Sequence, residues 1–213
     1  MMAALESRAG SRVEPIVYVV DDDKRMREAL LDLLAAAHRR ASAFASGSEF
    51  LRTADTSTPG CLVIDLQMPV GSGLEVQDKL LALGCPMPLI FLTGHADVPS
   101  SVTALKAGAS DFILKPFAAE ILLEAVDTAI QRDAERRQMM DERDRVRALA
   151  DTLTQREREV MWLVASGLMN KQVAYELAIC EMTVKLHRMN AMRKMECRSL
   201  ADLVRIVEKL RAA

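Results

Sequence analysis

Four short apolar runs within the first 115 residues each lead into side chains that can do chemistry. The runs are 16–20, followed by Asp21, Asp22 and Asp23; 61–64, followed by Asp65; 89–92, followed by Thr93; and 112–114, followed by Lys115. Carboxylates supply hard oxygen ligands for Mg²⁺, while a metal ion, an ammonium and a hydroxyl can together bind the oxygens of a phosphoryl group. These residue types predict phosphoryl chemistry with Mg²⁺ as the cofactor and Asp65 as the acceptor.

Parallel β-strands are the elements that would bring these side chains together. A continuous apolar run is typical of a strand buried on both faces, and the carboxyl ends of parallel strands meet at one edge of a sheet. Between the runs, the pattern predicts helices at about 24–37, 47–51, 74–83 and 99–107, and a weak further strand at 41–44. This alternation predicts an α/β doubly wound, five-stranded parallel sheet in the order 2-1-3-4-5.

The order Asp-Asp, Asp, Thr and Lys-Pro after successive strands resembles the receiver domain of two-component response regulators, over roughly residues 15–130. The resemblance implies that Asp65 is the phosphoacceptor and that Asp22 is a Mg²⁺ ligand. Asp21 would complete the acidic pocket, and the backbone carbonyl of Gln67 would also face the metal. Thr93 matches the switch hydroxyl, Phe112 the switch aromatic and Lys115 the phosphate-pairing lysine, and the bond between Lys115 and Pro116 is expected to be cis.

Two further residues near this pocket have competing interpretations. Asp23 is expected to cap the following helix rather than bind metal, because acidic side chains favour helix starts. His95 stands two residues after Thr93, where the family's side chain can influence loss of the phosphoryl group, but an ordinary exposed histidine fits equally well.

Length and composition indicate two modest domains joined by a connector. The chain has 213 residues, half of them apolar, which exceeds the ~150 residues usual for one domain. We expect a flexible start at 1–14, a receiver at 15–130, a helical linker at 131–151 and a second domain at 152–213. Residues 1–129 carry 11 Lys and Arg against 17 Asp and Glu, while residues 151–213 carry 11 against 8. An acidic front half suits a cation site, and a mildly basic rear half suits a polyanion.

The cysteines and the hydropathy pattern bear on the compartment. The four cysteines include no C-x-x-C pair, which favours reduced thiols over disulfides or zinc. Residues 1–15 lack the apolar stretch of a signal peptide, and no run approaches the ~18 apolar residues of a membrane span. We therefore expect a soluble, cytoplasmic protein with no membrane partner.

The expected linker has a half-filled heptad pattern. Its positions are Ala129, Arg132, Arg136, Met139, Arg143, Val146, Ala150 and Leu153. Two interpretations stay open from the sequence: a solvated helix with charges of both signs, or a weak coiled coil that aligns two subunits.

The last sixty residues indicate a small helical domain. Thr154 and Glu157 form a capping box that starts a helix ending at Gly167, and two short helices follow at about 171–177 and 182–195. On the second of these, Val184, His187, Ala191 and Met195 share one side and are expected to pack. Lys185, Leu186, Met189 and Arg193 lie to the side or opposite, where a helix can enter a major groove.

Leu153-Thr154-Gln155-Arg156-Glu157, Gly167-Leu168-Met169-Asn170-Lys171 and Thr183-Val184-Lys185-Leu186-His187-Arg188 resemble the LuxR-type helix-turn-helix of the FixJ and NarL groups. Met169 replaces the proline common in the family's turn, which should alter local stiffness only. The resemblance implies that Lys185, Leu186 and Met189 face base edges, with Met189 making apolar contacts, for instance to thymine methyls. The DNA-contact set that it implies is Lys171, Thr183, Lys185, Leu186, Arg188, Met189 and Arg193, with Lys171, Arg188 and Arg193 on phosphates.

These observations predict a transcriptional response regulator rather than an enzyme. A sensor histidine kinase would phosphorylate Asp65, and the modified protein would form a homodimer on a two-fold-symmetric promoter site, partly through the last helix at 200–210. Two other functions compete. A haloacid-dehalogenase-like phosphatase would use Asp21 and Asp23 but lacks a late acidic pair, and a constitutive DNA-binding protein would use the receiver only for dimerisation.

Overall fold

The computed structural model describes residues 13–69, 71–85, 87–94 and 111–211, and it divides the chain into two compact units, up to Arg136 and from Arg137 onward. None of the helices within those described stretches combines the length and apolar character that a membrane span requires.

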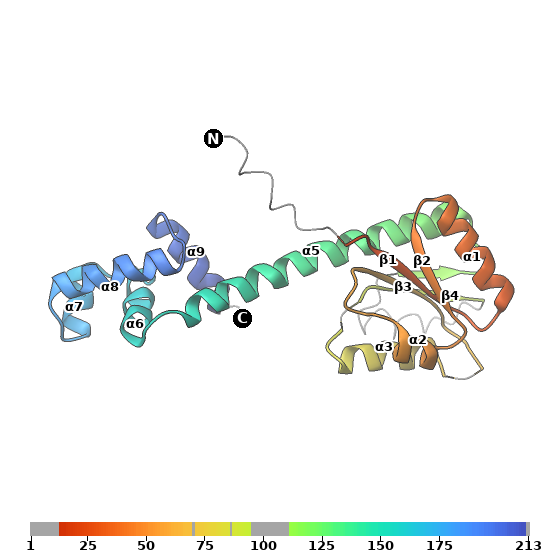
Figure 1. The fold of residues 1–213 in the computed structure, drawn as a ribbon, viewed down its shortest axis with the longest axis horizontal. Helices are drawn as coiled ribbons and strands as arrows, with labels where there is room; N and C mark the ends of the chain where they lie inside the picture. The colour runs from red at the N-terminus through yellow and green to blue at the C-terminus, as the bar shows by residue number, and fades with distance from the viewer. Residues whose placement is uncertain (1–12, 70, 86, 95–110, 212–213) are drawn as a thin grey trace. The chain divides into compact units, whose positions relative to one another are not determined.

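The first unit is built on a five-stranded parallel sheet (Figure 1). Its strands are β1 (Ile16–Val20), β2 (Arg40–Phe44), β3 (Gly60–Asp65), β4 (Leu89–Thr93) and β5 (Asp111–Leu114). The hydrogen-bonded order is β2-β1-β3-β4-β5, and every neighbouring pair is parallel. The predicted fold class and strand order are confirmed, because each buried apolar run does form a strand.

Helices cover both faces of this sheet. They are α1 (Lys24–Ala36), α2 (Gly47–Thr53), α3 (Gly73–Ala82) and α5 (Ala119–Asp151). Successive strand side chains point to opposite faces: Val17 and Val19 pack with α1 and α5, whereas Tyr18 and Val20 pack with α2 and α3. The helix expected at 99–107 lies outside the described residues, as does His95.

Capping side chains fix where the helices begin. Asp23 accepts a hydrogen bond from the amide of Arg25 at the start of α1, so its expected capping role is confirmed. Ser46 caps α2 in the same way. Ser72 caps α3, which therefore begins at Gly73, one residue before the predicted start.

Helix α5 runs without a break from the first unit into the second. The apolar residues of its heptad pattern are used inside the two cores: Ala129 packs on the sheet, and Val146, Ala150 and Leu153 pack with the C-terminal helices. Met139 is the exception, with 71% of its surface exposed. An apolar seam running the length of the helix is therefore not available to a partner helix, which favours the solvated-linker interpretation.

The second unit is a small helical bundle. Its helices are α6 (Gln155–Ala165), α7 (Asn170–Glu176), α8 (Glu181–Lys194) and α9 (Leu200–Arg211), packed with the end of α5. The predicted capping box is present, with Thr154 and Glu157 each accepting from the other's backbone amide. Glu157 is also buried against Lys194, whose ammonium lies 2.6 Å from the carboxylate. This contact ties the start of α6 to the end of α8.

Candidate functional site

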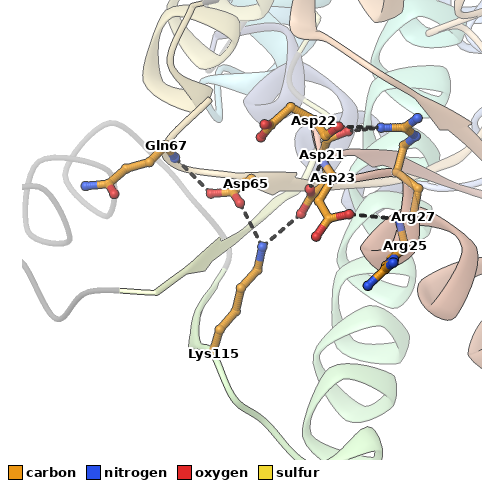
Figure 2. Close-up of polar contacts among 8 residues, drawn as sticks. All are labelled: Asp21, Asp22, Asp23, Arg25, Arg27, Asp65, Gln67 and Lys115. Carbon is orange, nitrogen blue, oxygen red and sulfur yellow. Dashed lines mark hydrogen bonds and ion pairs between the residues drawn. The ribbon is translucent and has the colours of Figure 1, made fainter. Parts of the chain in front are cut away.

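Three acidic side chains and one lysine converge at the carboxyl edge of the sheet (Figure 2). Asp21 is buried, Asp65 is mostly buried and Asp22 is exposed, and their carboxylate oxygens lie within 4.8 Å of one another. The ammonium of Lys115 lies 2.8 Å from Asp21 Oδ2 and 2.7 Å from Asp65 Oδ2. The sequence-predicted residues from three strands therefore meet in one pocket.

The strand order explains this convergence. β1 and β3 are neighbours, so Asp21, just after β1, and Asp65, the last residue of β3, end at the same level. Lys115 follows β5, and its amide donates to the carbonyl of Thr93 at the end of β4, at 2.7 Å. Its side chain reaches back past β4 to both carboxylates.

The electrostatics of the pocket favour a cation. Burial lowers the pKa of Lys115, but hydrogen bonds and charge attraction from Asp21 and Asp65 outweigh that effect and hold the pKa above its ordinary value. One ammonium faces three carboxylates, and hard oxygen donors clustered at this spacing suit Mg²⁺. The donor set therefore fits the predicted cofactor.

The other predicted residues of the pocket have defined positions. Thr93 is fully buried at the end of β4, and Phe112 is partly buried with its ring centroid 6.3 Å from that of Phe91. The backbone amide of Gln67 donates a hydrogen bond to Asp65 Oδ1 at 2.8 Å, while the exposed Gln67 side chain points away from Asp65 (Figure 2). The bond between Lys115 and Pro116 is cis, as the resemblance implies.

Sequence reasoning missed Arg27 as part of this site. One guanidinium nitrogen donates to the backbone carbonyls of Asp21 and Asp22, at 2.7 and 3.0 Å (Figure 2). The amide of Asp23 also donates to Asp21 Oδ1, at 2.8 Å. These bonds hold the acidic loop in shape, and no spacing rule in the sequence distinguishes Arg27 from its neighbour Arg25.

Gly73 is a second residue that the sequence did not single out for the site. A Cβ atom there would lie 2.7 Å from the backbone oxygen of Asp65 and 2.9 Å from the ring of Phe91. Only glycine lets the start of α3 approach the end of β3 this closely.

The second candidate surface is formed by α7 and α8. Val184, Ala191 and Met195 are buried and His187 is partly buried, while Lys185, Leu186, Met189 and Arg193 are exposed, which confirms the predicted division of the helix. Lys171 is exposed on the first turn of α7. Thr183 is partly buried, with its hydroxyl 3.0 Å from the thiol of Cys180.

Two basic residues of this surface already have partners. Arg188 is partly buried and donates to the side chain of Asn170 at 3.0 Å, so it fastens α8 to the first residue of α7. Lys185 pairs with Glu181 at 3.3 Å, one turn earlier on the same helix. An exposed pair of this kind is worth little in water, so the lysine can exchange it for a phosphate or a base.

Two known families match this chain, one on each side of the boundary between its two compact units. The family described as "Response regulator receiver domain" matches residues 17–127, and the family "Bacterial regulatory proteins, luxR family" matches residues 151–207.

Similar proteins match across both parts. Nodulation protein W of Bradyrhizobium diazoefficiens is 46% identical over 92% of this chain and 86% of its own length. Response regulator protein TmoT of Ectopseudomonas mendocina is 43% identical over 93% of this chain and 90% of its own. Transcriptional regulatory protein FixJ of Rhizobium meliloti is 40% identical over 89% and 93%.

Two solved structures also match over nearly the whole chain. The response regulator StyR matches with a TM-score of 0.84 and 46% identity, over 92% of this chain and 99% of that one. Full-length FixJ from B. japonicum matches with a TM-score of 0.58 and 34% identity, over 94% and 99%.

Proposed function

Because this chain belongs to the family of two-component DNA-binding response regulators, with a receiver domain followed by a LuxR-type DNA-binding domain, we propose that Asp65 accepts a phosphoryl group from a partner histidine kinase and that this modification promotes dimerisation and promoter binding. The observation that carries the proposal is the position of Asp65, which shares the ammonium of Lys115 with Asp21 and has carboxylate oxygens of Asp21 and Asp22 within 4.8 Å of its own. The family is one of DNA-binding regulators and not of enzymes. We therefore assign Asp65 the role of the residue that is modified, and not the role of a catalytic residue.

The proposed step is a phosphoryl transfer between side chains. A carboxylate oxygen of Asp65 forms a bond to phosphorus as the nitrogen–phosphorus bond of the kinase's phosphohistidine breaks, and the imidazole stays with the kinase. Asp21, Asp22, Asp65 and the backbone carbonyl of Gln67 would hold Mg²⁺, which neutralises phosphoryl oxygens when bound. Lys115 would move its contact from the Asp65 carboxylate to a phosphoryl oxygen, and Thr93 would hydrogen-bond another.

The new charge explains how the modification changes the domain. Phosphorylation would replace the −1 carboxylate of the mostly buried Asp65 by an acyl phosphate with a charge of nearly −2 and three further oxygens, so Thr93 and Lys115 would shift to meet it. Phe112 belongs to β5 and precedes Lys115 by three residues. We propose that, as the switch aromatic, it changes position when Lys115 shifts. A coupling of about 1.4 kcal/mol gives a tenfold change in affinity, which a few charge-assisted hydrogen bonds can supply.

The output is DNA binding by α7 and α8. We propose that Lys185, Leu186 and Met189 face base edges and that Lys171, Arg188 and Arg193 contact phosphates, with two subunits on a two-fold-symmetric site. Thr183 completes the proposed DNA-contact set. Such a protein works where the chromosome is, so we place it in the cytoplasm. The four-segment division at residues 14, 130 and 151 stays part of this proposal.

A selection of genomic DNA fragments by the purified full-length chain tests the proposal. The selection is run with Mg²⁺ at one fixed salt concentration, with and without a small phosphodonor, because affinity for DNA depends on salt. We expect a two-fold-symmetric motif that is enriched mainly with the donor, and no donor effect in Asp65→Asn. The matched control Asp78→Asn, at an exposed acid on α3, should behave as wild type.

Two results would contradict parts of this proposal. Equal enrichment of one motif with and without donor would make the receiver a constitutive dimerisation module. No enrichment in either arm would remove DNA binding from the proposed function.

A further inference from the structure

Helix α8 presents a row of large apolar side chains to solvent. Met182, Leu186 and Met189 are 72%, 52% and 60% exposed. Their i, i+4, i+7 spacing places them on one face of the helix. Val184 and Ala191 lie on the opposite face and are buried. We call these three exposed residues the apolar crest.

The crest belongs to a wider concentration of exposed apolar surface on the helix-turn-helix. Among described residues from 152 onward, the exposed large apolar side chains are Met169, Tyr175, Met182, Leu186, Met189 and Leu200. All except Leu200 lie on α7, on its cap or on α8. Contiguous exposed apolar surface usually marks an interaction site.

The charges around the crest indicate which partner covers it. Lys185 and Arg193 are exposed on α8, and Lys171 is exposed on α7. Residues 151–213 carry 11 Lys and Arg against 8 Asp and Glu. An apolar row bordered by cations fits duplex DNA, in which phosphates flank a groove floor that is partly apolar. It fits a second protein less well, because that partner would have to supply several acids.

The chemistry of the crest limits what it can recognise in the groove. Leucine has no polar side-chain atom, and a methionine thioether is only a weak acceptor. The groups that natural base pairs present in the major groove are hydrogen-bond donors and acceptors, with one apolar exception, the C5-methyl of thymine. We propose that the apolar crest makes thymine methyl groups the sequence determinant that this protein reads, with Met182, Leu186 and Met189 as the specificity-determining residues.

This inference rests on the proposed function and refines it. Seven residues of α-helix rise about 10 Å, which matches roughly three base-pair steps. The crest therefore spans one short thymine-containing segment in each half-site. Lys185, to one side of the crest, remains able to donate to a guanine.

The test removes single methyl groups from DNA. The highest-affinity duplex from the genomic selection is remade with deoxyuridine in place of thymine, position by position, which deletes only the C5-methyl. Dissociation constants of the full-length chain are measured at the salt and phosphodonor conditions of the selection. We expect roughly fourfold weaker binding for each contacted methyl, the value for one buried carbon group. The effect should be confined to one short segment in each half-site.

Variants assign that effect to the crest. At the base position that Met189 contacts, the Met189→Ala variant should bind the thymine and the deoxyuridine duplex with nearly equal affinity. Met189→Leu should keep the wild-type ratio of the two dissociation constants. Met139→Ala is the matched control, because Met139 is the same residue type at 71% exposure on α5. It should keep the full ratio at every position.

Specific binding that is unaffected by deoxyuridine at any position overturns this inference and leaves the proposed function standing. A thymine preference that survives Met182→Ala, Leu186→Ala and Met189→Ala alike overturns the assignment to the crest. Absence of specific binding to the unmodified duplex overturns both.

Discussion

At the scale of single residues, the receiver pocket is a balance between one ammonium and several carboxylates. Lys115 bridges Asp21 and Asp65, so in this state it occupies oxygens that a cation would also bind. The lysine neutralises part of the negative charge, and in the proposed phosphorylation it is the group that would have to release Asp65. Its position therefore affects both cation affinity and the proposed switch.

Replacing Lys115 by methionine should strengthen Mg²⁺ binding. The change removes a positive charge less than 3 Å from two carboxylates, and at an effective dielectric constant of about 20 a charge at this range is worth a few kcal/mol. We expect affinity to rise at least about tenfold, measured by calorimetric titration of the full-length chain. Lys79→Met, at an exposed lysine on α3, is the control and should change nothing. Unchanged affinity in Lys115→Met would argue that these carboxylates are not the cation's ligands.

At the scale of elements, two buried carboxylates connect segments that are distant in sequence. In the first unit, Asp133 of α5 is 1% exposed, accepts from the amide of Gly60 at 3.0 Å and pairs with Arg136. In the second unit, Glu157 joins the start of α6 to Lys194 of α8. Both act where a helix end or a strand start would otherwise leave backbone amides without an acceptor.

Asp133→Ala should destabilise the first unit by about 3 kcal/mol. The change leaves the buried amide of Gly60 without its acceptor and Arg136 without this carboxylate. Asp127 offers a matched control on the same helix, because its ion pair with Arg39 is about half exposed, so Asp127→Ala should cost below about 1 kcal/mol. Urea denaturation of the full-length chain, followed by circular dichroism, would measure both. Equal losses of stability for the two variants would refute the conclusion that the buried Asp133 carboxylate holds β3 and α5 together.

The Glu157 contact predicts a pH dependence of the second unit. Burial raises the pKa of Glu157, but hydrogen bonds from Lys194 and from the Thr154 amide outweigh it and place the pKa below the ordinary 4.5. Because the folded pKa is the lower one, the stabilisation is complete above about pH 4.5 and is lost as pH falls through the folded pKa. Glu157→Gln should lose about 1–2 kcal/mol at pH 7 and show a weaker loss on acidification.

The pH dependence of the second unit's stability can be measured with the single tryptophan, because Trp162 lies on α6. Its fluorescence follows unfolding of the second unit in the intact chain. Glu159→Gln, at a partly exposed acid two residues further along α6 that pairs with Arg156, serves as the control. A Glu157→Gln variant with wild-type pH dependence would show that the carboxylate is not the titrating group.

At the scale of the whole molecule, the long helix α5 connects a phosphoacceptor domain to a DNA-binding domain. Except for Met139, the apolar residues of the heptad pattern are buried in the two cores, and the stretch between those cores carries charges of both signs. We therefore expect the proposed dimer to form through surfaces of the domains rather than through a coiled coil along α5.

Met139→Glu tests this directly. Met139 is the one exposed apolar member of the heptad pattern, so a charge there should abolish a coiled coil but leave domain-driven dimerisation intact. We expect light scattering to show donor-dependent doubling of mass for wild type and for Met139→Glu, and none for Asp65→Asn. Loss of the dimer in Met139→Glu would instead restore the coiled-coil interpretation.

The sequence by itself determined the features that depend on local pattern. Buried apolar runs followed by Asp21, Asp65, Thr93 and Lys115 predict both the parallel sheet and the edge where those side chains meet, because the carboxyl ends of parallel strands coincide. The Thr154 capping box and the two faces of α8 were also predictable, since they follow from spacings of three and four residues.

The tertiary structure alone decided which distant residues support those features. Arg27 holds the acidic loop through backbone carbonyls, Asp133 binds an amide 73 positions away, and Gly73 is required by the close approach of Asp65. It also showed that Val146 and Ala150, two positions of an apparent dimer seam, are buried within their own unit. Such contacts depend on which surfaces meet after folding, and no local periodicity encodes them.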